Sequence, residues 1–224
     1  MYGEPISQII RERLKKSHAS FLANDNISDF ITKEELGELQ KEVAQKVSSL
    51  MDSLIIDVEN DHNTMDTANR VAKFYITELF SGRYTPPPST TVFPNVKKLE
   101  SFYIVGPISF NSSCAHHLVP IVGEVWIGLD PKDDLLGLSK FHRITEWVMA
   151  RPQIQEEATV QVLEYIEELI KPKGIAVLIN ASHYCMQGRG VKDPEILMKS
   201  FAASGTLNNE KSKTDFLQLI RLNG

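Results

Sequence analysis

The sequence predicts an α+β fold in which two pairs of strands flank two helices, with a helical extension in front. Three observations predict it: apolar residues at helical spacing before a proline-rich stretch, β-rich runs after it, and a second helical stretch between those runs. The chain has 224 residues, of which 42% are hydrophobic. This is enough for one catalytic domain with an N-terminal extension.

The first residues are mixed and polar. They contain an amphipathic stretch from Ile6 to Leu14, followed by a break rich in Asn and Asp at 24–26. We therefore expect a loosely attached arm before the first long helix.

Two helices are expected in the extension. Apolar residues recur at spacings of three to five between Ser28 and Ile56, and Thr32 followed by Glu35 is a capping-box pattern near the start. A second helix is expected from Thr67 to Phe80, and Gly82 is expected to close its C-terminal end.

Three consecutive prolines lie within Arg83–Ser89, where they cannot donate ladder hydrogen bonds and so indicate an extended linker. Strands and helices are expected beyond it, in the order strand, strand, helix, helix, strand, strand, helix: Ser101–Cys114, Val119–Leu129, Lys140–Ala150, Gln153–Ile170, Gly174–Met186, Ile196–Leu207 and Lys211–Leu222. The expected organisation is an N-terminal arm, a helical region, a proline-rich linker and a catalytic domain: residues 1–26, 27–82, 83–98 and 99–224.

Charge and hydropathy exclude several classes of partner. The net charge is −5, so the overall field repels polyanions and predicts no nucleic-acid partner; any phosphate site must be a local basic pocket. No run of 18 apolar residues appears, and the N-terminal segment lacks the apolar region of a secretory signal. We expect a cytoplasmic protein without membrane contact.

The two cysteines leave three interpretations: buried spectators, a disulfide, or metal ligands. A stable disulfide is the least favoured of these in a reducing cytosol. Cys114 precedes His116 and His117, and Cys185 follows His183, so each cysteine has a histidine close by. This pairing favours metal ligands over spectators.

Two cysteines and one histidine would leave one position on a metal ion open for water, which is typical of a catalytic zinc site. Of His116, His117 and His183, one would complete the metal shell. The other two would then be left to move protons, a role for which the ordinary histidine pKa of about 6.5 is suited.

Four short motifs follow one another in the second half of the chain. They are Ser113-Cys114 with His116-His117, Gly137-Leu138-Ser139-Lys140 with Arg143, Arg151-Pro152-Gln153 with Gln155-Glu156, and His183-Tyr184-Cys185 with Arg189-Gly190. In this order, over roughly residues 64–222, they resemble the GTP cyclohydrolase I family.

The resemblance implies a tunnelling fold, in which antiparallel strand pairs flank two helices (ββααββ) and the subunits form a ring-shaped homo-oligomer, expected to be a decamer, with active sites at subunit interfaces. The implied enzyme is GTP cyclohydrolase I, a hydrolase acting on cyclic amidine C–N bonds. Its reaction is the zinc-dependent hydrolysis and rearrangement of GTP to 7,8-dihydroneopterin triphosphate with release of formate, the first step of pterin and folate biosynthesis.

The same resemblance assigns roles to the cysteines and histidines. It implies that Cys114, His117 and Cys185 hold Zn²⁺. It leaves His116 and His183 as catalytic histidines in the pocket, and we choose His183 as the general acid or base.

The resemblance also implies the groups that bind GTP. Glu156, with Gln155 beside it, matches the guanine anchor, since one carboxylate can accept from the ring N–H and the exocyclic amine together. Without the resemblance, the two residues would read as a solvated helix start. The positions that match the triphosphate-binding groups are Ser139, Lys140, Arg143, Arg189, Arg70 and Lys73. Arg70 and Lys73 also fit a simple solvated pair on a helix face.

Three positions depart from the family pattern. Ala115 stands where a glutamate is usual, which removes a carboxylate beside the expected metal; loss of such a supporting group costs about 10- to 100-fold in metal affinity or activity. Ala68 replaces a usual proline, and Ser200-Phe201-Ala202 replaces a usual Thr-Ser-Ala. Phe201 is expected to change the packing at the subunit interface.

These departures leave alternatives to full turnover. One is a divergent homologue with an altered step or substrate, for example one that only opens the ring. Another is a tunnelling-fold regulatory subunit without activity. A third is a reductase of the deazapurine pathway, which the sequence disfavours because both cysteines are assigned to metal and no G-x-G-x-x-G phosphate loop appears.

Overall fold

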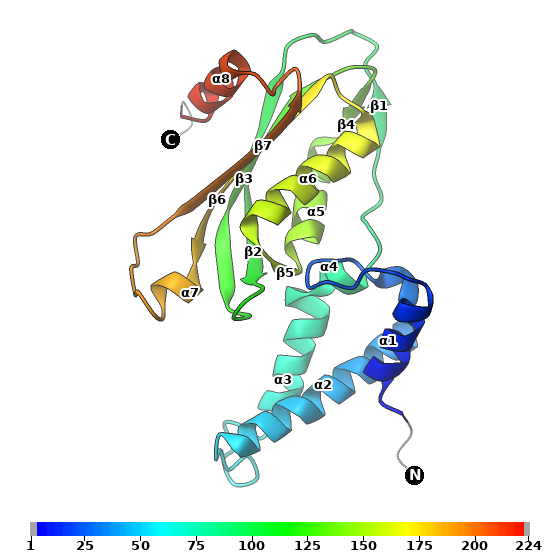
Figure 1. Ribbon diagram of the computed structural model, residues 1–224, viewed down its shortest axis with the longest axis vertical. Helices are drawn as coiled ribbons and strands as arrows, with labels where there is room; N and C mark the ends of the chain where they lie inside the picture. The colour runs from blue at the N-terminus through cyan, green and yellow to red at the C-terminus, as the bar shows by residue number, and fades with distance from the viewer. Residues whose placement is uncertain (1–3, 222–224) are drawn as a thin grey trace. The chain divides into compact units, whose positions relative to one another are not determined.

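The computed structural model describes residues 4–221 and divides into two compact units, Met1–Pro86 and Pro87–Gly224 (Figure 1). The expected linker 83–98 contains the boundary between them. Within residues 4–221, no helix combines the length and apolar character needed to cross a membrane.

The first unit is helical. Its elements are α1 (Ile6–Lys16), the 3₁₀ turn η1 (Ser28–Phe30), α2 (Lys33–Ser53), α3 (Thr67–Lys73), the π-helix η2 (Phe74–Leu79) and α4 (Ser81–Tyr84). The expected capping box of α2 is confirmed: the Thr32 side chain accepts from the Glu35 backbone N–H, and the Glu35 carboxylate accepts from the Thr32 backbone N–H at 2.9 Å. The expected second helix is also present, with its last six residues in π-helical form.

The N-terminal segment is packed more firmly than a loose arm. Ile10 and Leu14 of α1 are buried in a small apolar cluster with Ile27. The Arg13 guanidinium donates to both carboxylate oxygens of Glu35 at 2.8 and 2.5 Å, which ties α1 to the start of α2. The amphipathic pattern of Ile6–Leu14 therefore has a partner face within the same unit.

The second unit is a five-stranded sheet with helices on both faces. Its elements are β1 (Val92–Pro94), β2 (Tyr103–Cys114), β3 (Pro120–Asp130), β4 (Asp134–Leu136), α5 (Leu138–Met149), β5 (Pro152–Gln153), α6 (Gln155–Ile170), β6 (Gly174–His183), α7 (Tyr184–Gln187), β7 (Met198–Gly205) and α8 (Glu210–Arg221). The strand order is β5-β2-β3-β6-β7. The long strands pair antiparallel, and only the short β5 pairs parallel to its neighbour, β2.

Alternate residues of the strands serve two different cores. Ile175, Val177 and Ile179 of β6 face α5 and α6 in the main core, whereas Ala176 and Leu178 face α8 (Figure 1). β6 is buried on both faces, so it reads as a near-continuous apolar run rather than as an alternating one. Phe216 of α8 is fully buried in the second core, with its ring centroid 5.8 Å from that of Phe201.

The structure differs from the expected elements at the end of β6 and in the linker. The strand expected over Gly174–Met186 ends at His183, because its pairing with β3 ends there and the chain turns into α7. Cys185 therefore lies on a short helix and not on a strand. Part of the expected linker forms β1, which pairs with β4. Leu222, the expected end of the last helix, lies outside the described residues.

Candidate metal centre

The last residues of β2 and β6 and the first residues of β3 lie together at one end of the sheet. Ser113 pairs with Pro120 across β2 and β3, and Ile121 pairs with His183 across β3 and β6. The turn that follows β2 and the helix that follows β6 therefore start side by side. Strand register thus brings together two segments about 70 residues apart in the sequence.

The turn after β2 is held by its own backbone. Cys114 N–H donates to the Val119 carbonyl at 2.9 Å, and Leu118 N–H donates back to the Cys114 carbonyl at 2.8 Å. Leu118 has a φ of 53°, which few non-glycine residues adopt. Ala115 N–H donates to the Gln153 carbonyl of β5 at 2.9 Å. These bonds fix the backbone that presents Cys114 and His117.

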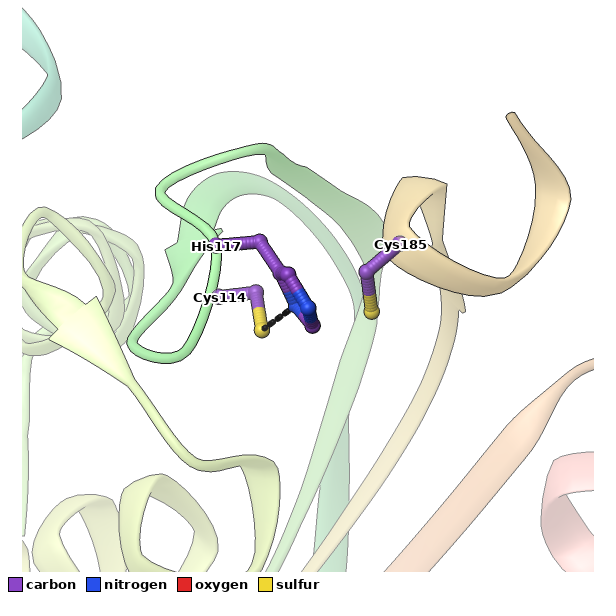
Figure 2. Close-up of side chains that lie close together, drawn as sticks. All are labelled: Cys114, His117 and Cys185. Carbon is purple, nitrogen blue, oxygen red and sulfur yellow. Dashed lines mark hydrogen bonds between the residues drawn. The ribbon is translucent and has the colours of Figure 1, made fainter. Parts of the chain in front are cut away.

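Cys114, His117 and Cys185 converge on one point (Figure 2). Among the described residues they form a group whose ligand atoms all lie within 4.8 Å of one another. Cys114 is buried, Cys185 is half-buried and His117 is exposed, so the group is open to solvent on the histidine side. Both cysteines are free thiols.

His116 and His117 differ in whether they lie close to Cys185. The Cys114 sulfur lies 3.7 Å from Nδ1 of His116 and 3.9 Å from Nδ1 of His117, so contact with Cys114 does not distinguish them. Within the described chain, only His117 belongs to the group that also includes Cys185.

The donor set fits zinc. Zn–S bonds of about 2.3 Å and Zn–N bonds of about 2.0 Å place tetrahedral ligand atoms roughly 3.6–3.8 Å apart. The three side chains lie within 4.8 Å of one another and need to move by only about 1 Å to reach that geometry. Two thiolates and one imidazole are ligands that zinc prefers, and the fourth position would be left for water.

Without a bound metal, the surroundings of Cys185 favour its neutral thiol. Burial raises the pKa of the Cys185 thiol above its ordinary value, and the adjacent Cys114 raises it further. A bound metal ion would reverse that direction, because coordination stabilises the thiolate. Arg189, predicted to bind phosphate, donates from Nη1 to Nε2 of His117 at 2.6 Å, so the structure places it beside the trio.

His183 stands at the same sheet edge, joined to the start of α6. Its Nε2 lies 2.7 Å from Oε1 of Gln155, which is only 2% exposed. Burial lowers the pKa of His183, and the nearby Glu156 carboxylate acts against that shift. The structure therefore places His183, Gln155 and Glu156 close together.

An apolar hollow adjoins His183. It has a volume of about 340 Å³ and is lined by His183, Met186, Ile196, Leu197 and Met198. These apolar lining residues were not predicted as site residues, because the run from Ile196 to Met198 reads as the start of a strand. Thr159 and Ser200, which contact Gln155, were also missed as site residues. The spacing of Thr159 four residues after Gln155 on one helix face was a usable signal.

The predicted phosphate-binding residues do not all gather at this edge. The C-terminal end of α5 leads into β5, which pairs with Cys114, whereas Ser139, Lys140 and Arg143 lie in the first two turns of α5. At 1.5 Å per residue they lie about 9–15 Å further along the helix axis. Lys140 donates to the Ser89 carbonyl at 2.9 Å.

Arg70 and Lys73 belong to the first unit. Arg70 there forms an exposed ion pair with Asp66 at 3.1 Å, four residues earlier on the chain. Their role at the site stays a prediction.

Known proteins of one family are similar to this chain over most of its length. A family model described as GTP cyclohydrolase I matches residues 43–221. A GTP cyclohydrolase 1 from Yersinia enterocolitica is 34% identical over 184 residues, which cover 81% of this chain and 83% of the relative. One from Citrobacter koseri is 34% identical over 181 residues, covering 80% and 81%. A crystal structure of an archaeosine synthase QueF-Like protein matches at 17% identity and a TM-score of 0.36 over 54% of this chain and 97% of that one, which is too low for any inference.

Proposed function

This chain belongs to the GTP cyclohydrolase I family, and on that premise we propose that it converts GTP to 7,8-dihydroneopterin triphosphate and formate with zinc in the metal centre. The family assignment makes it a GTP cyclohydrolase enzyme. The product, the metal and the assembly are parts of the proposal.

One observation supports the proposal best. The trio Cys114, His117 and Cys185 and the pair His183 and Gln155 lie at the same end of one sheet, although they come from three separate segments of the chain. A metal-binding group next to a histidine with a fixed hydrogen-bond partner is the minimum needed for hydrolysis of a purine ring.

The trio would hold the zinc ion, which when bound supplies an activated water molecule at neutral pH. The buried position of Cys114 and the backbone bonds of its turn keep two of the three ligands in place. Arg189, beside His117, is available for a phosphate oxygen of the substrate.

His183 would give a proton to the imidazole nitrogen of GTP as the ring opens. A second hydrolysis then releases C8 as formate, and closure of the sugar carbons onto the pyrimidine releases one water. Glu156, exposed in the first turn of α6, would accept from the guanine ring N–H and amine.

The separation of the phosphate-binding residues supports an assembly. One chain sets Ser139, Lys140 and Arg143 apart from its own metal trio along α5, so a second copy would have to supply them to the same pocket. We propose a homo-oligomer with sites between subunits, and a decameric ring is the expected form.

The direct test is turnover of GTP by the purified, zinc-loaded protein. Formate and a pterin that becomes fluorescent on oxidation are expected in equal amounts. Accumulation of an opened pyrimidine without pterin would favour the divergent homologue that stops after ring opening. Absence of any change in GTP would favour a regulatory subunit.

A mixing experiment tests the shared site. Cys185→Ser and Arg143→Ala are each expected to be inactive alone. If the pocket combines residues from two copies, unfolding and refolding the two variants together restores part of the activity. A mixed oligomer without any activity would contradict the shared site, and light scattering would show that mixed oligomers had formed.

A further inference from the structure

We infer that Gln155 is a positioning residue for His183, which it holds in the tautomer protonated at Nε2, and that Gln155 does not contact guanine. The inference rests on the proposed function for its kinetic consequences. Its structural part concerns the hydrogen bonds of the buried amide and stands without that function.

The surroundings of the Gln155 amide fix its orientation. Its nitrogen lies 3.2 Å from the Ile179 carbonyl, 3.0 Å from the Met198 carbonyl and 3.0 Å from the Ser200 hydroxyl. Two carbonyl oxygens accept and cannot donate, so this end of the amide must be the NH₂ group. The other end, Oε1, therefore faces Nε2 of His183 at 2.7 Å.

A chain of hydroxyl groups completes the assignment. Thr159 donates its hydroxyl proton to the Gln155 backbone carbonyl at 2.7 Å. Since a hydroxyl has only one proton, the 2.6 Å contact between Thr159 and Ser200 must have Ser200 as its donor. The Ser200 oxygen is then free to accept from the Gln155 amide, and both amide protons have partners.

The orientation of the Gln155 amide determines which ring nitrogen of His183 carries a proton. An amide oxygen can only accept, so Nε2 of His183 must carry a proton to make the 2.7 Å contact. In the neutral ring Nδ1 then has the lone pair, and Nδ1 is the nitrogen that exchanges a proton with the substrate. The partner of the other ring nitrogen sets which nitrogen is reactive.

The same count of hydrogen bonds leaves the Gln155 amide no proton with which to bind guanine. The residue is 2% exposed, and neither of its amide protons is left for a ligand. Glu156, the next residue, is exposed and is left to bind the base. This differs from the role that the family resemblance implied for Gln155.

The kinetic test uses Gln155→Met, which keeps length and removes the hydrogen bonds. The expected result is a fall in kcat of about 10- to 100-fold, as for loss of a supporting partner, with KM for GTP and bound zinc unchanged. The preference for GTP over ITP, which lacks the exocyclic amine, also stays unchanged. The matched control Glu156→Gln should instead raise KM and reduce that preference.

A higher KM or a lost preference for GTP in Gln155→Met would overturn the inference, and so would unchanged kinetics.

A spectroscopic measurement covers the case in which Gln155→Met fails to fold. Nitrogen NMR of the unaltered protein with isotope-labelled histidine reports which ring nitrogen is protonated in each of the six histidines. The His183 signal is identified by its loss in His183→Gln. A neutral ring protonated at Nε2 supports the inference, and one protonated at Nδ1 overturns it, whether or not the protein releases formate.

Discussion

Substitution of a single histidine tests the metal centre without a measurement of catalytic activity. His117→Ala removes one of three ligands, whereas His116→Ala removes a neighbour that lies as close to Cys114 but outside the group with Cys185. We expect zinc to stabilise the unaltered protein and His116→Ala, and to leave His117→Ala almost unaffected. The comparison is matched, because both histidines are exposed and adjacent in one turn.

The magnitude follows from mass action. Free zinc at about 100 times its dissociation constant adds about 2.7 kcal/mol to the free energy of unfolding. For a chain of this size, 1 kcal/mol shifts Tm by about 2–4 °C, so the expected rise is about 5–11 °C. If loss of His117 weakens binding at least 100-fold, the same zinc concentration adds no more than about 0.4 kcal/mol, or about 1 °C.

Thermal unfolding with and without zinc, together with metal analysis after gel filtration, measures both quantities. A full zinc-induced shift and one bound zinc per chain in His117→Ala would refute the assignment of the trio. A lost shift in His116→Ala would show that the wrong histidine has been assigned.

Three further predictions concern other parts of the chain. Ala115→Glu restores a carboxylate beside Cys114 and should tighten zinc binding by up to about 10- to 100-fold in a chelator competition; unchanged affinity would show that this position does not support the metal. Arg13 and the Thr32 backbone lower the pKa of Glu35 to about 2 from 4.5, so its carboxylate stabilises the folded chain above about pH 4.5 and stops doing so as the pH falls towards 2. Urea unfolding should therefore show Glu35→Gln about 1 kcal/mol less stable at neutral pH, with the difference shrinking on acidification. Phe216→Ala should cost about 3–5 kcal/mol in the same assay while keeping the zinc-induced shift, because Phe216 is the buried residue that holds α8 on the sheet; a loss below 1 kcal/mol would contradict that packing.

Local signals predicted most of the secondary structure. The capping box at Thr32 and the apolar spacing of α2 depend only on neighbouring residues, so they could be read directly. The end of β6 at His183 could not, because that end depends on where β3 stops pairing. The π-helical turn of Phe74–Leu79 likewise had no local signal that we recognised.

The sequence by itself determined the chemistry of the candidate site. Residue type pointed to both cysteines and one histidine as ligands, since only a few side chains bind zinc, and the family resemblance implied that the histidine is His117. Only the tertiary structure decided which atoms meet. Strand register brought Cys185 to His117 and not to His116, and two backbone carbonyls beside the Gln155 amide nitrogen direct its oxygen to His183. The physical reason is that hydrogen-bond direction and ligand distance depend on segments far apart in the chain, which meet only when the sheet has formed.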